Sequence, residues 1–194
     1  MKICVFQGTF NPIHTAHTDV AEYIKNKYDF DKIIFIPAYN PPHKDVALAQ
    51  DRFNMVKLAL ENKNGFEVSD IEYKRGGISY TYLTIKELYE IYDIEDKINF
   101  IIGTDAFKNI ESWYEADKLK ELVKFLVFNR KYVFTQKEIY NLSDKGYDFE
   151  IMDLPFNDVS SSELREIIKN GGNTKGKLDN KVEEYIKKHG LYTS

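Results

Sequence analysis

Two of the four histidines in this chain, His14 and His17, stand three residues apart after an apolar segment typical of a buried strand. In the intervening residues 8–13, Gly8 permits a tight turn and a close backbone approach to a ligand. At a helix start the two histidines share one face, beside backbone N–H groups that bind phosphate. Histidines at a plain surface cap are the alternative. The position after a strand favours a phosphate site with two imidazole donors.

A second polar loop follows the next apolar segment. Residues 37–44 contain three prolines, which make the loop stiff and extended. The loop carries Asn40 and ends in His43 and Lys44, a hydrogen-bond donor and a fixed positive charge that together suit an anion. Standing alone, the same pattern also fits a rigid surface loop whose charges are solvated.

A third apolar segment ends in Gly103, Thr104 and Asp105. A small residue followed by a carboxylate at the end of a strand suits the hydroxyl groups of a ribose. The equal alternative is that Asp105 is the N-cap of a helix, because a carboxylate there accepts a hydrogen bond from the first turn.

Three consecutive serines, residues 160–162, open a predicted helix, and Arg165 follows one turn later. Hydroxyl and N–H groups at a helix start suit a triphosphate, and a planar guanidinium binds phosphate oxygens. The structural alternative is a capping box over residues 161–164. The nearby stretch 171–177 resembles a phosphate-binding loop, but Leu178 replaces the required Ser or Thr, so a flexible connection is expected there.

Short apolar runs alternate with helical patterns along most of the chain, which predicts a parallel sheet covered on both faces. Right-handed crossovers then make a doubly wound α/β domain, with its ligands beyond the carboxyl ends of the strands. Helices are predicted over residues 18–28, 51–61, 81–91, 161–169 and 179–188. Strands are predicted over residues 3–6, 33–36, 66–69, 100–102, 125–128 and 149–152.

The composition is that of a globular protein, with 43% apolar and 30% charged residues and a net charge of −4. The length of 194 residues suits a single domain over 1–194 with a small helical C-terminal part. The acidic balance argues against a nucleic-acid partner, and no apolar run is long enough to span a membrane. The one cysteine, Cys4, is expected in the core. We expect a cytoplasmic protein, and the sequence is compatible with either a monomer or a homo-oligomer.

Residues 8–14 together with His17 resemble the signature of the HxGH nucleotidyltransferase superfamily. Further motifs follow in the order that is usual for the bacterial nicotinate-nucleotide adenylyltransferase family, and the resemblance runs from residue 2 to residue 192. These motifs are residues 40–44, 79–81, 103–105, 113–114, 160–162 with Arg165, and 190–192.

The resemblance implies a Rossmann-like nucleotidyltransferase fold and adenylyl transfer from ATP to nicotinate mononucleotide, which yields deamido-NAD and pyrophosphate. It implies that His14, His17 and Arg165 are catalytic, and that Mg²⁺ travels with ATP on phosphate and water rather than on a protein metal site. The ATP-binding residues it implies are Gly8, Thr9, Phe10, Gly103, Asp105, Ser160, Ser161 and Ser162. The mononucleotide-binding residues it implies are Asn11, Asn40, Lys44, Tyr80, Thr81, Trp113, Tyr114 and Arg130.

The chain departs from the family pattern at three places. Gln7 and Ala16 stand where the family usually has glycine, and Lys131-Tyr132 replaces a usual Pro-Gly after Arg130. Gln7 is expected to narrow the adenosine pocket, and the altered loop puts the contact of Arg130 in question.

Two other readings stay open at this point. The first is the same chemistry on nicotinamide mononucleotide, phosphopantetheine or flavin mononucleotide. The second is a nucleotide-binding module that has lost catalysis. The pair Trp113-Tyr114 and the motif at residues 79–81 favour a pyridine nucleotide, and the retained histidines favour an enzyme. No acidic residue lies in 79–82 to prefer an amide, so we expect the acid to be the better acceptor.

Overall fold

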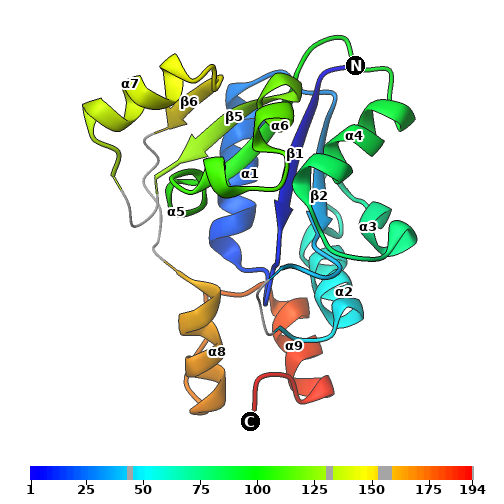
Figure 1. Ribbon diagram of the computed structural model, residues 1–194. Coiled ribbons are helices and arrows are strands. Elements are labelled where there is room, and N and C mark those ends of the chain that lie inside the picture. The colour runs from blue at the N-terminus through cyan, green and yellow to red at the C-terminus, as the bar shows by residue number, and fades with distance from the viewer. Residues whose placement is uncertain (43–45, 130–132, 153–158, 194) are drawn as a thin grey trace.

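The computed structural model of the chain describes residues 1–42, 46–129, 133–152 and 159–193. In these residues six parallel strands form one sheet in the order β3-β2-β1-β4-β5-β6 (Figure 1). The strands are β1 (Ile3–Gly8), β2 (Lys32–Pro37), β3 (Phe66–Val68), β4 (Ile98–Gly103), β5 (Val123–Phe128) and β6 (Phe149–Met152). The α-helices are α1 (Thr15–Lys27), α2 (Ala49–Leu60), α3 (Ile71–Arg75), α4 (Thr81–Ile91), α5 (Thr104–Phe107), α6 (Ala116–Leu122), α7 (Gln136–Asp144), α8 (Ser161–Lys169) and α9 (Asn180–His189), and η1 (Ile110–Ser112) is a 3₁₀ turn.

Both faces of the sheet are covered, which explains why its strands read as unbroken apolar runs. In β1, Ile3 and Val5 pack into one buried cluster, and Cys4 and Phe6 pack into the other. Successive side chains of a strand point to opposite faces, so each strand contributes to two cores. Cys4 is fully buried, and burial raises the pKa of its thiol, as expected for a core cysteine.

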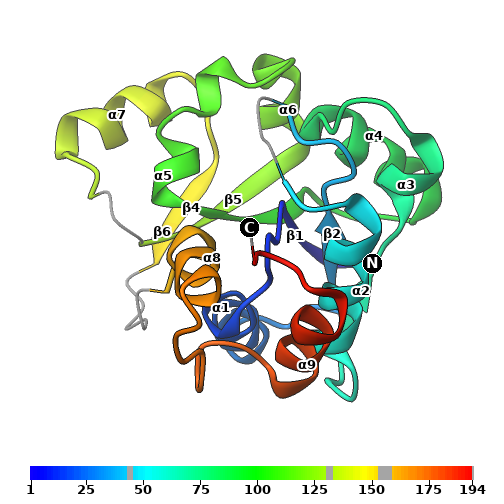
Figure 2. The same ribbon diagram turned by 90° about the horizontal axis from the view of Figure 1, so that it is seen from below.

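The helices form two layers. Buried residues of α1, α2, α8 and α9 belong to one cluster, and buried residues of α3, α4, α6 and α7 belong to the other. Figure 2 shows the sheet edge-on between α1, α8 and α9 on one side and α4, α6 and α7 on the other. The doubly wound sheet with a helical C-terminal part, which the sequence predicts, is therefore confirmed.

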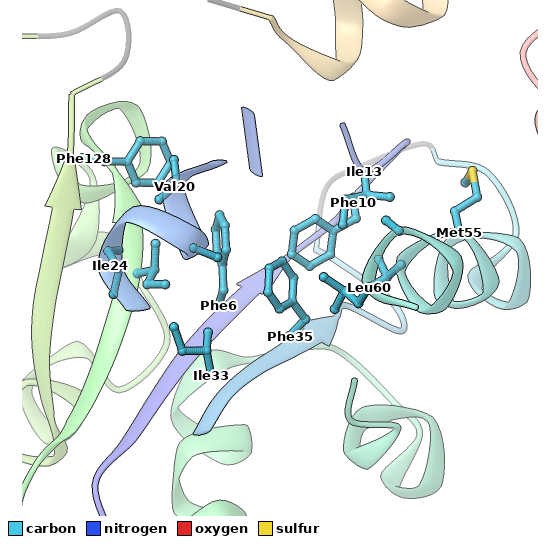
Figure 3. Packing of buried hydrophobic residues seen from close by; sticks show 14 of the residues in the cluster. Phe6, Phe10, Ile13, Val20, Ile24, Ile33, Phe35, Met55, Leu60 and Phe128 are labelled. Carbon is cyan, nitrogen blue, oxygen red and sulfur yellow. The ribbon is translucent and has the colours of Figure 1, made fainter. Parts of the chain in front are cut away.

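An aromatic group fills the core under the end of β1. The ring centroid of Phe6 lies 5.6 Å from that of Phe10, 5.4 Å from that of Phe35 and 6.1 Å from that of Phe128 (Figure 3). These rings meet at tilted or edge-on angles, the geometry that aromatic pairs prefer. The loop after β1 is thus anchored to the core through Phe10.

The strand order reverses beside β1, which has β2 on one side and β4 on the other. At such a switch point the loops after the two central strands run in opposite directions and leave a crevice between them. In Figure 1, α8 and α9 lie beyond the carboxyl end of β1, so the C-terminal helices stand next to this crevice.

The predicted elements are all present, with shifted ends, and further short helices appear between them. The first helix begins at Thr15 rather than at residue 18, which places His14 at its N-cap. Helices α3, α5, α6 and α7 were outside the sequence prediction. None of the helices in the described ranges is long and apolar enough to cross a membrane.

Candidate active site

A cleft of about 860 Å³ opens at the carboxyl ends of β1, β2, β4 and β5. This is the switch point of the sheet, where doubly wound folds bind ligands, and the volume lies in the usual range for small-molecule sites of about 300–1,000 Å³. The residues that border it with polar groups are Gln7, Thr9, Asn11, His17, Ser79, Tyr80, Thr81, Ser112, Trp113, Tyr114, Ser160, Ser161, Ser162 and Arg165.

The two histidines take different places at the start of α1. His14 is the N-cap and is only 3% exposed, whereas His17 borders the cleft. The two rings lie 3.8 Å apart, and the ring of Phe10 meets that of His17 edge-on at 5.1 Å. The backbone N–H of His14 donates to Nδ1 of His17 at 3.2 Å. Because Nδ1 is an acceptor, the proton of a neutral His17 sits on Nε2.

The loop after β1 is shaped by two close contacts. Phe10 has a φ of +47°, a left-handed conformation that is uncommon outside glycine, and its ring is 2% exposed. A Cβ on Gly8 would lie 3.0 Å from the Phe10 ring. Gly8 is therefore needed for packing against Phe10 rather than for an unusual backbone angle of its own.

Arg52 of α2 is fully buried and hydrogen-bonds to the backbone of this loop. Its Nη1 donates to Thr9 O at 2.9 Å and to Ala38 O at 2.5 Å, and its Nη2 donates to Tyr39 O at 3.0 Å. Its Nε donates to Ala47 O at 3.0 Å. Burial lowers the pKa of the guanidinium, which an arginine nevertheless retains as a cation. One side chain thus ties the loop after β1 to the loop after β2.

The start of α1 offers fewer backbone donors than the sequence predicts. The N–H of Thr15 donates to Lys177 O at 3.0 Å, and the N–H of His17 donates to His14 O at 3.0 Å. The hydroxyl of Thr15 also donates to the carbonyls of Gly176 and Lys177. The connection at 171–177, expected to be flexible, therefore packs against the first turn of α1 and occupies donors that would face a phosphate.

The serines at the start of α8 are held by hydrogen bonds within the protein. Ser160 is the N-cap, and its Oγ accepts from the N–H of Glu163 at 3.2 Å, while Glu163 accepts from the N–H of Ser160 at 3.0 Å. This is a capping box, one residue earlier than the alternative at 161–164. The hydroxyl of Ser161 donates to Pro12 O at 3.0 Å. What α8 can offer a ligand is its first-turn N–H groups, at Ser161 and Ser162.

Arg165 joins α8 to the loop after β1. Its Nη1 donates to Asn11 O at 2.8 Å, and its Nη2 donates to Ser162 Oγ at 3.2 Å. Arg165 of α8 and His17 of α1 both border the cleft, and these two helices cover the same face of the sheet (Figure 2). A guanidinium and an imidazole near a helix N-terminus give this end of the cleft donors that suit phosphate oxygens.

The opposite end of the cleft is aromatic. The rings of Tyr80 and Tyr114 are stacked at 4.4 Å with 24° between their planes, and Trp113 meets Phe100 edge-on at 6.3 Å. Tyr80 is the N-cap of α4, and its N–H donates to Ile78 O at 3.0 Å. A helix that begins at Thr81 leaves the N–H groups of its first turn without partners inside the helix, but the N–H of Tyr80 is in use. Thr81 is the first residue of α4, and Trp113 supplies a flat apolar surface nearby.

Gln7 borders the cleft and is hydrogen-bonded to Glu72 of α3. Its Nε2 donates to Glu72 Oε1 at 2.5 Å, and the same Glu72 oxygen accepts from Thr84 Oγ1 at 2.6 Å. The other oxygen of Glu72 accepts from the N–H of Tyr39 at 3.0 Å. Glu72 is 1% exposed. Oε1 of Gln7 is buried and accepts no hydrogen bond from the described part of the chain.

The structure brings most of the predicted site residues to one cleft, and it sets three apart. His14 lies behind His17, and Asp105 lies in the first turn of α5, whose N-cap is Gly103. Asn40 is exposed, and its backbone exchanges hydrogen bonds with Ser79. Lys44 and Arg130 fall outside the described residues. The predicted residues that border the cleft are Gly8, Thr9, Phe10, Asn11, His17, Tyr80, Thr81, Gly103, Trp113, Tyr114, Ser160, Ser161, Ser162 and Arg165.

Sequence reasoning missed Arg52 and Glu72. Arg52 precedes Met55, Val56 and Ala59 by three, four and seven residues, so it occupies the buried face of α2. An arginine in an apolar stripe is the signal that was available, because a buried cation requires a built set of acceptors. Glu72 has no comparable signal, since α3 is too short to show a period.

Carboxylates are scarce at the phosphate end of the cleft. No group of three His, Cys, Asp or Glu side chains in the described ranges is placed to hold a metal ion. The donors there, His17 and Arg165, suit anionic oxygens.

Comparisons with known proteins agree with this architecture. Residues 5–167 match the cytidylyltransferase-like family model. The chain is 40% identical to a protein of Caldicellulosiruptor bescii named probable nicotinate-nucleotide adenylyltransferase, over 99% of both chains. It is 41% identical to a protein of the same name from Clostridium tetani, over 98% of both.

Solved structures share the fold. A nicotinic acid mononucleotide adenylyltransferase of Plasmodium falciparum, solved in complex with NaAD, superposes with a TM-score of 0.83 at 23% identity, over 98% of this chain and 97% of that one. The identity and coverage of the relatives above, together with the family match, show which family this is. The chain belongs to the cytidylyltransferase-like family and, within it, to the nicotinate-nucleotide adenylyltransferases.

Proposed function

We propose that this chain transfers the adenylyl group of ATP to nicotinate mononucleotide. An oxygen of the mononucleotide phosphate attacks the α-phosphorus of ATP, the bond from that phosphorus to the bridging oxygen breaks, and pyrophosphate leaves. The product is deamido-NAD. The observation that carries the proposal is the meeting of a phosphate end, with His17 and Arg165, and an aromatic end, with Trp113 and Tyr80, in one cleft. Membership of the family supports the same reaction.

The proposed chemistry needs position and charge rather than a nucleophilic side chain. Both reactants are phosphate anions, so donors placed around the reacting phosphorus stabilise the charge that develops there. His17 is proposed to donate from Nε2, because its Nδ1 accepts from the N–H of His14. Arg165 is proposed to hold the departing pyrophosphate together with the first turn of α8. His14 is proposed to act through His17, whose ring it supports.

The divalent cation of the reaction is proposed to be Mg²⁺, which enters as part of the ATP substrate. Mg²⁺ keeps several waters and binds phosphate oxygens readily, and it neutralises the charge of the leaving pyrophosphate. This fits a cleft whose phosphate end presents donors. Because the reaction consumes ATP, we place it in the cytoplasm.

The other roles are proposed from position. Gly8, Thr9, Phe10, Gly103 and Ser160–Ser162 surround the ATP side, and Asp105 is proposed to reach the ribose from the first turn of α5. Asn11, Tyr80, Thr81, Trp113 and Tyr114 surround the mononucleotide side. Asn40, Lys44 and Arg130 are proposed for the mononucleotide on the family pattern.

A pyrophosphate-release assay tests the proposal. The purified chain is supplied with MgATP and, in turn, nicotinate mononucleotide, nicotinamide mononucleotide, phosphopantetheine and flavin mononucleotide. We expect the fastest release with nicotinate mononucleotide. Release with one of the others alone would assign a different acceptor. If ATP binds but no acceptor releases pyrophosphate, the chain is a nucleotide-binding module without catalysis.

A further inference from the structure

The C-terminal segment of the chain reaches back to a residue that borders the cleft. The hydroxyl of Tyr192 donates to Oδ1 of Asn11 at 2.8 Å, across 181 residues of sequence. The backbone N–H of Ala47 donates to the same oxygen at 3.3 Å. Figure 2 shows the C-terminal end of the chain over the end of β1, in agreement with this contact. Tyr192, two positions before the last residue of the sequence, therefore binds a residue that borders the cleft.

The two donors define how the Asn11 amide is turned. A backbone N–H can only donate, so the atom facing Ala47 is the amide oxygen and not the nitrogen. Burial raises the pKa of Tyr192, so its hydroxyl keeps its proton as a donor. Both lone pairs of Oδ1 are then occupied. Asn11, which is 5% exposed, has only its N–H₂ group left to offer a ligand.

The backbone around Asn11 is held equally firmly. Arg165 donates to Asn11 O at 2.8 Å, Ser161 donates to Pro12 O at 3.0 Å, and Arg52 donates to Thr9 O at 2.9 Å. These bonds set the main chain and leave the side-chain amide as the remaining freedom. Its orientation depends on Tyr192 and Ala47 alone among the bonds described for Oδ1.

We propose that Tyr192 is a positioning residue, which locks the Asn11 amide so that its N–H₂ group faces the phosphate of the bound mononucleotide. The inference rests on the proposed function. Without the Tyr192 hydroxyl, only the Ala47 N–H at 3.3 Å still holds Oδ1, so the amide turns by half a rotation more often than in the wild type. An amide oxygen would then face an anionic phosphate oxygen, which replaces an attraction by a repulsion.

A double-mutant cycle between Tyr192→Phe and Asn11→Ala tests this. Tyr192→Phe removes one oxygen atom and keeps the ring. We expect it to lower kcat/KM for nicotinate mononucleotide about 5- to 20-fold, the usual effect of one buried hydrogen bond to a binding group. The KM for ATP should change less than about 2-fold. In the Asn11→Ala background the same substitution should cost less than about 2-fold, because the side chain that it positions is gone.

Tyr185→Phe is the matched control. The Tyr185 hydroxyl bonds to α2, donating to Asp51 at 2.8 Å and accepting from Asn54 at 2.9 Å, and Asn11 is not among its described hydrogen-bond partners. Tyr185→Phe should keep kcat/KM within about 2-fold of the wild-type value. Its melting temperature should fall by about as much as that of Tyr192→Phe. An equal loss from Tyr192→Phe in both backgrounds, or no loss in the wild-type background, would overturn the proposal.

The side-chain amide of Asn11 gives a readout that separates this proposal from the proposed function. The NMR signals of its N–H₂ group should be two separate, slowly exchanging lines in the wild-type chain, and their exchange should be faster in Tyr192→Phe, whatever reaction the chain catalyses. If the wild-type chain releases no pyrophosphate, the proposed function fails, and these signals then decide about Tyr192. Unchanged signals in Tyr192→Phe would show that Tyr192 does not hold the Asn11 amide.

Discussion

The rings of His14 and His17 lie 3.8 Å apart, and His17 Nδ1 accepts the backbone N–H of His14 at 3.2 Å. The second histidine therefore caps the helix that the first one begins. This reciprocal contact fixes the ring of His17 and leaves Nε2 as its donor nitrogen, beside the cleft. A helix cap and a phosphate donor thus share one imidazole ring, and two substitutions can separate these roles.

His17→Asn should abolish most activity and keep the fold. The Asn oxygen occupies the place of Nδ1 and can still accept the His14 N–H, but nothing replaces Nε2. Loss of one transition-state donor costs about 10²- to 10³-fold in kcat, or about 3 kcal/mol. Steady-state pyrophosphate release measures the loss, and thermal unfolding checks the fold.

His17→Gln is the matched control for this prediction. Its amide nitrogen reaches the place of Nε2, but the acceptor for the His14 N–H is lost. We expect a lower melting temperature than for His17→Asn together with higher activity. If Asn is as active as the wild type, His17 serves only as a cap.

Arg165→Lys should impair the use of ATP although it preserves the charge. Arg165 spans Asn11 O and Ser162 Oγ with two nitrogens of one planar group, which a lysine cannot reproduce. We expect kcat/KM for ATP to fall at least about 10-fold, equivalent to about 1.4 kcal/mol. Lys169→Arg, at the far end of α8, is the control. Kinetics unchanged in both variants would make Arg165 a structural link only.

Nicotinate mononucleotide should be preferred over nicotinamide mononucleotide. The carboxylate of nicotinate is expected to accept charge-assisted hydrogen bonds from N–H groups at the start of α4. Both oxygens of the nearby Glu72 already accept hydrogen bonds within the protein, so Glu72 does not favour the N–H groups of an amide. Loss of such bonds on changing acid to amide should cost about 2–4 kcal/mol, or roughly 30- to 1,000-fold in kcat/KM. Rates on both acceptors at saturating ATP measure the ratio. Equal efficiency would instead point to Oε1 of Gln7 as an acceptor for the amide N–H.

Arg52→Met should destabilise the protein strongly. It leaves the carbonyls of Thr9, Ala38, Tyr39 and Ala47 without the donor that they share. Because several buried acceptors lose one charged partner, the free energy of unfolding should fall by about 3–5 kcal/mol in total. Urea unfolding measures this. Lys57→Met, an exposed change on the same helix, should stay within about 0.5 kcal/mol. A small effect of Arg52→Met would mean that water replaces the guanidinium.

The fold could be predicted because each central strand is an unbroken apolar run, as in residues 33–36, and such runs have few other uses in a chain of this length. The short helices α5 and α6 span four and seven residues, too few for a period to appear. Helix α7 was missed although Thr135 and Glu138 form a capping box, a signal that the sequence did contain.

The loops that form the candidate site could be predicted from the sequence. Which residue of each loop faces the cleft, and which one only supports the structure, could not. Spacing alone places His14 and His17 on one face and cannot tell that His14 is buried behind His17. Likewise, the hydroxyl of Ser160 was expected to face a ligand, and it is used in a helix cap. The contact between Tyr192 and Asn11 joins the two ends of the chain, and sequence periodicity carries no information about it.

The most direct test of the proposed reaction follows the phosphorus atoms of ATP. The wild-type chain is given nicotinate mononucleotide and MgATP labelled at either the α- or the γ-phosphorus, and the products are separated. Adenylyl transfer predicts that the α-label appears in the dinucleotide and the γ-label in pyrophosphate, in equal amounts. A γ-label on the mononucleotide, with ADP as the second product, would contradict the account, because it would show phosphoryl rather than adenylyl transfer.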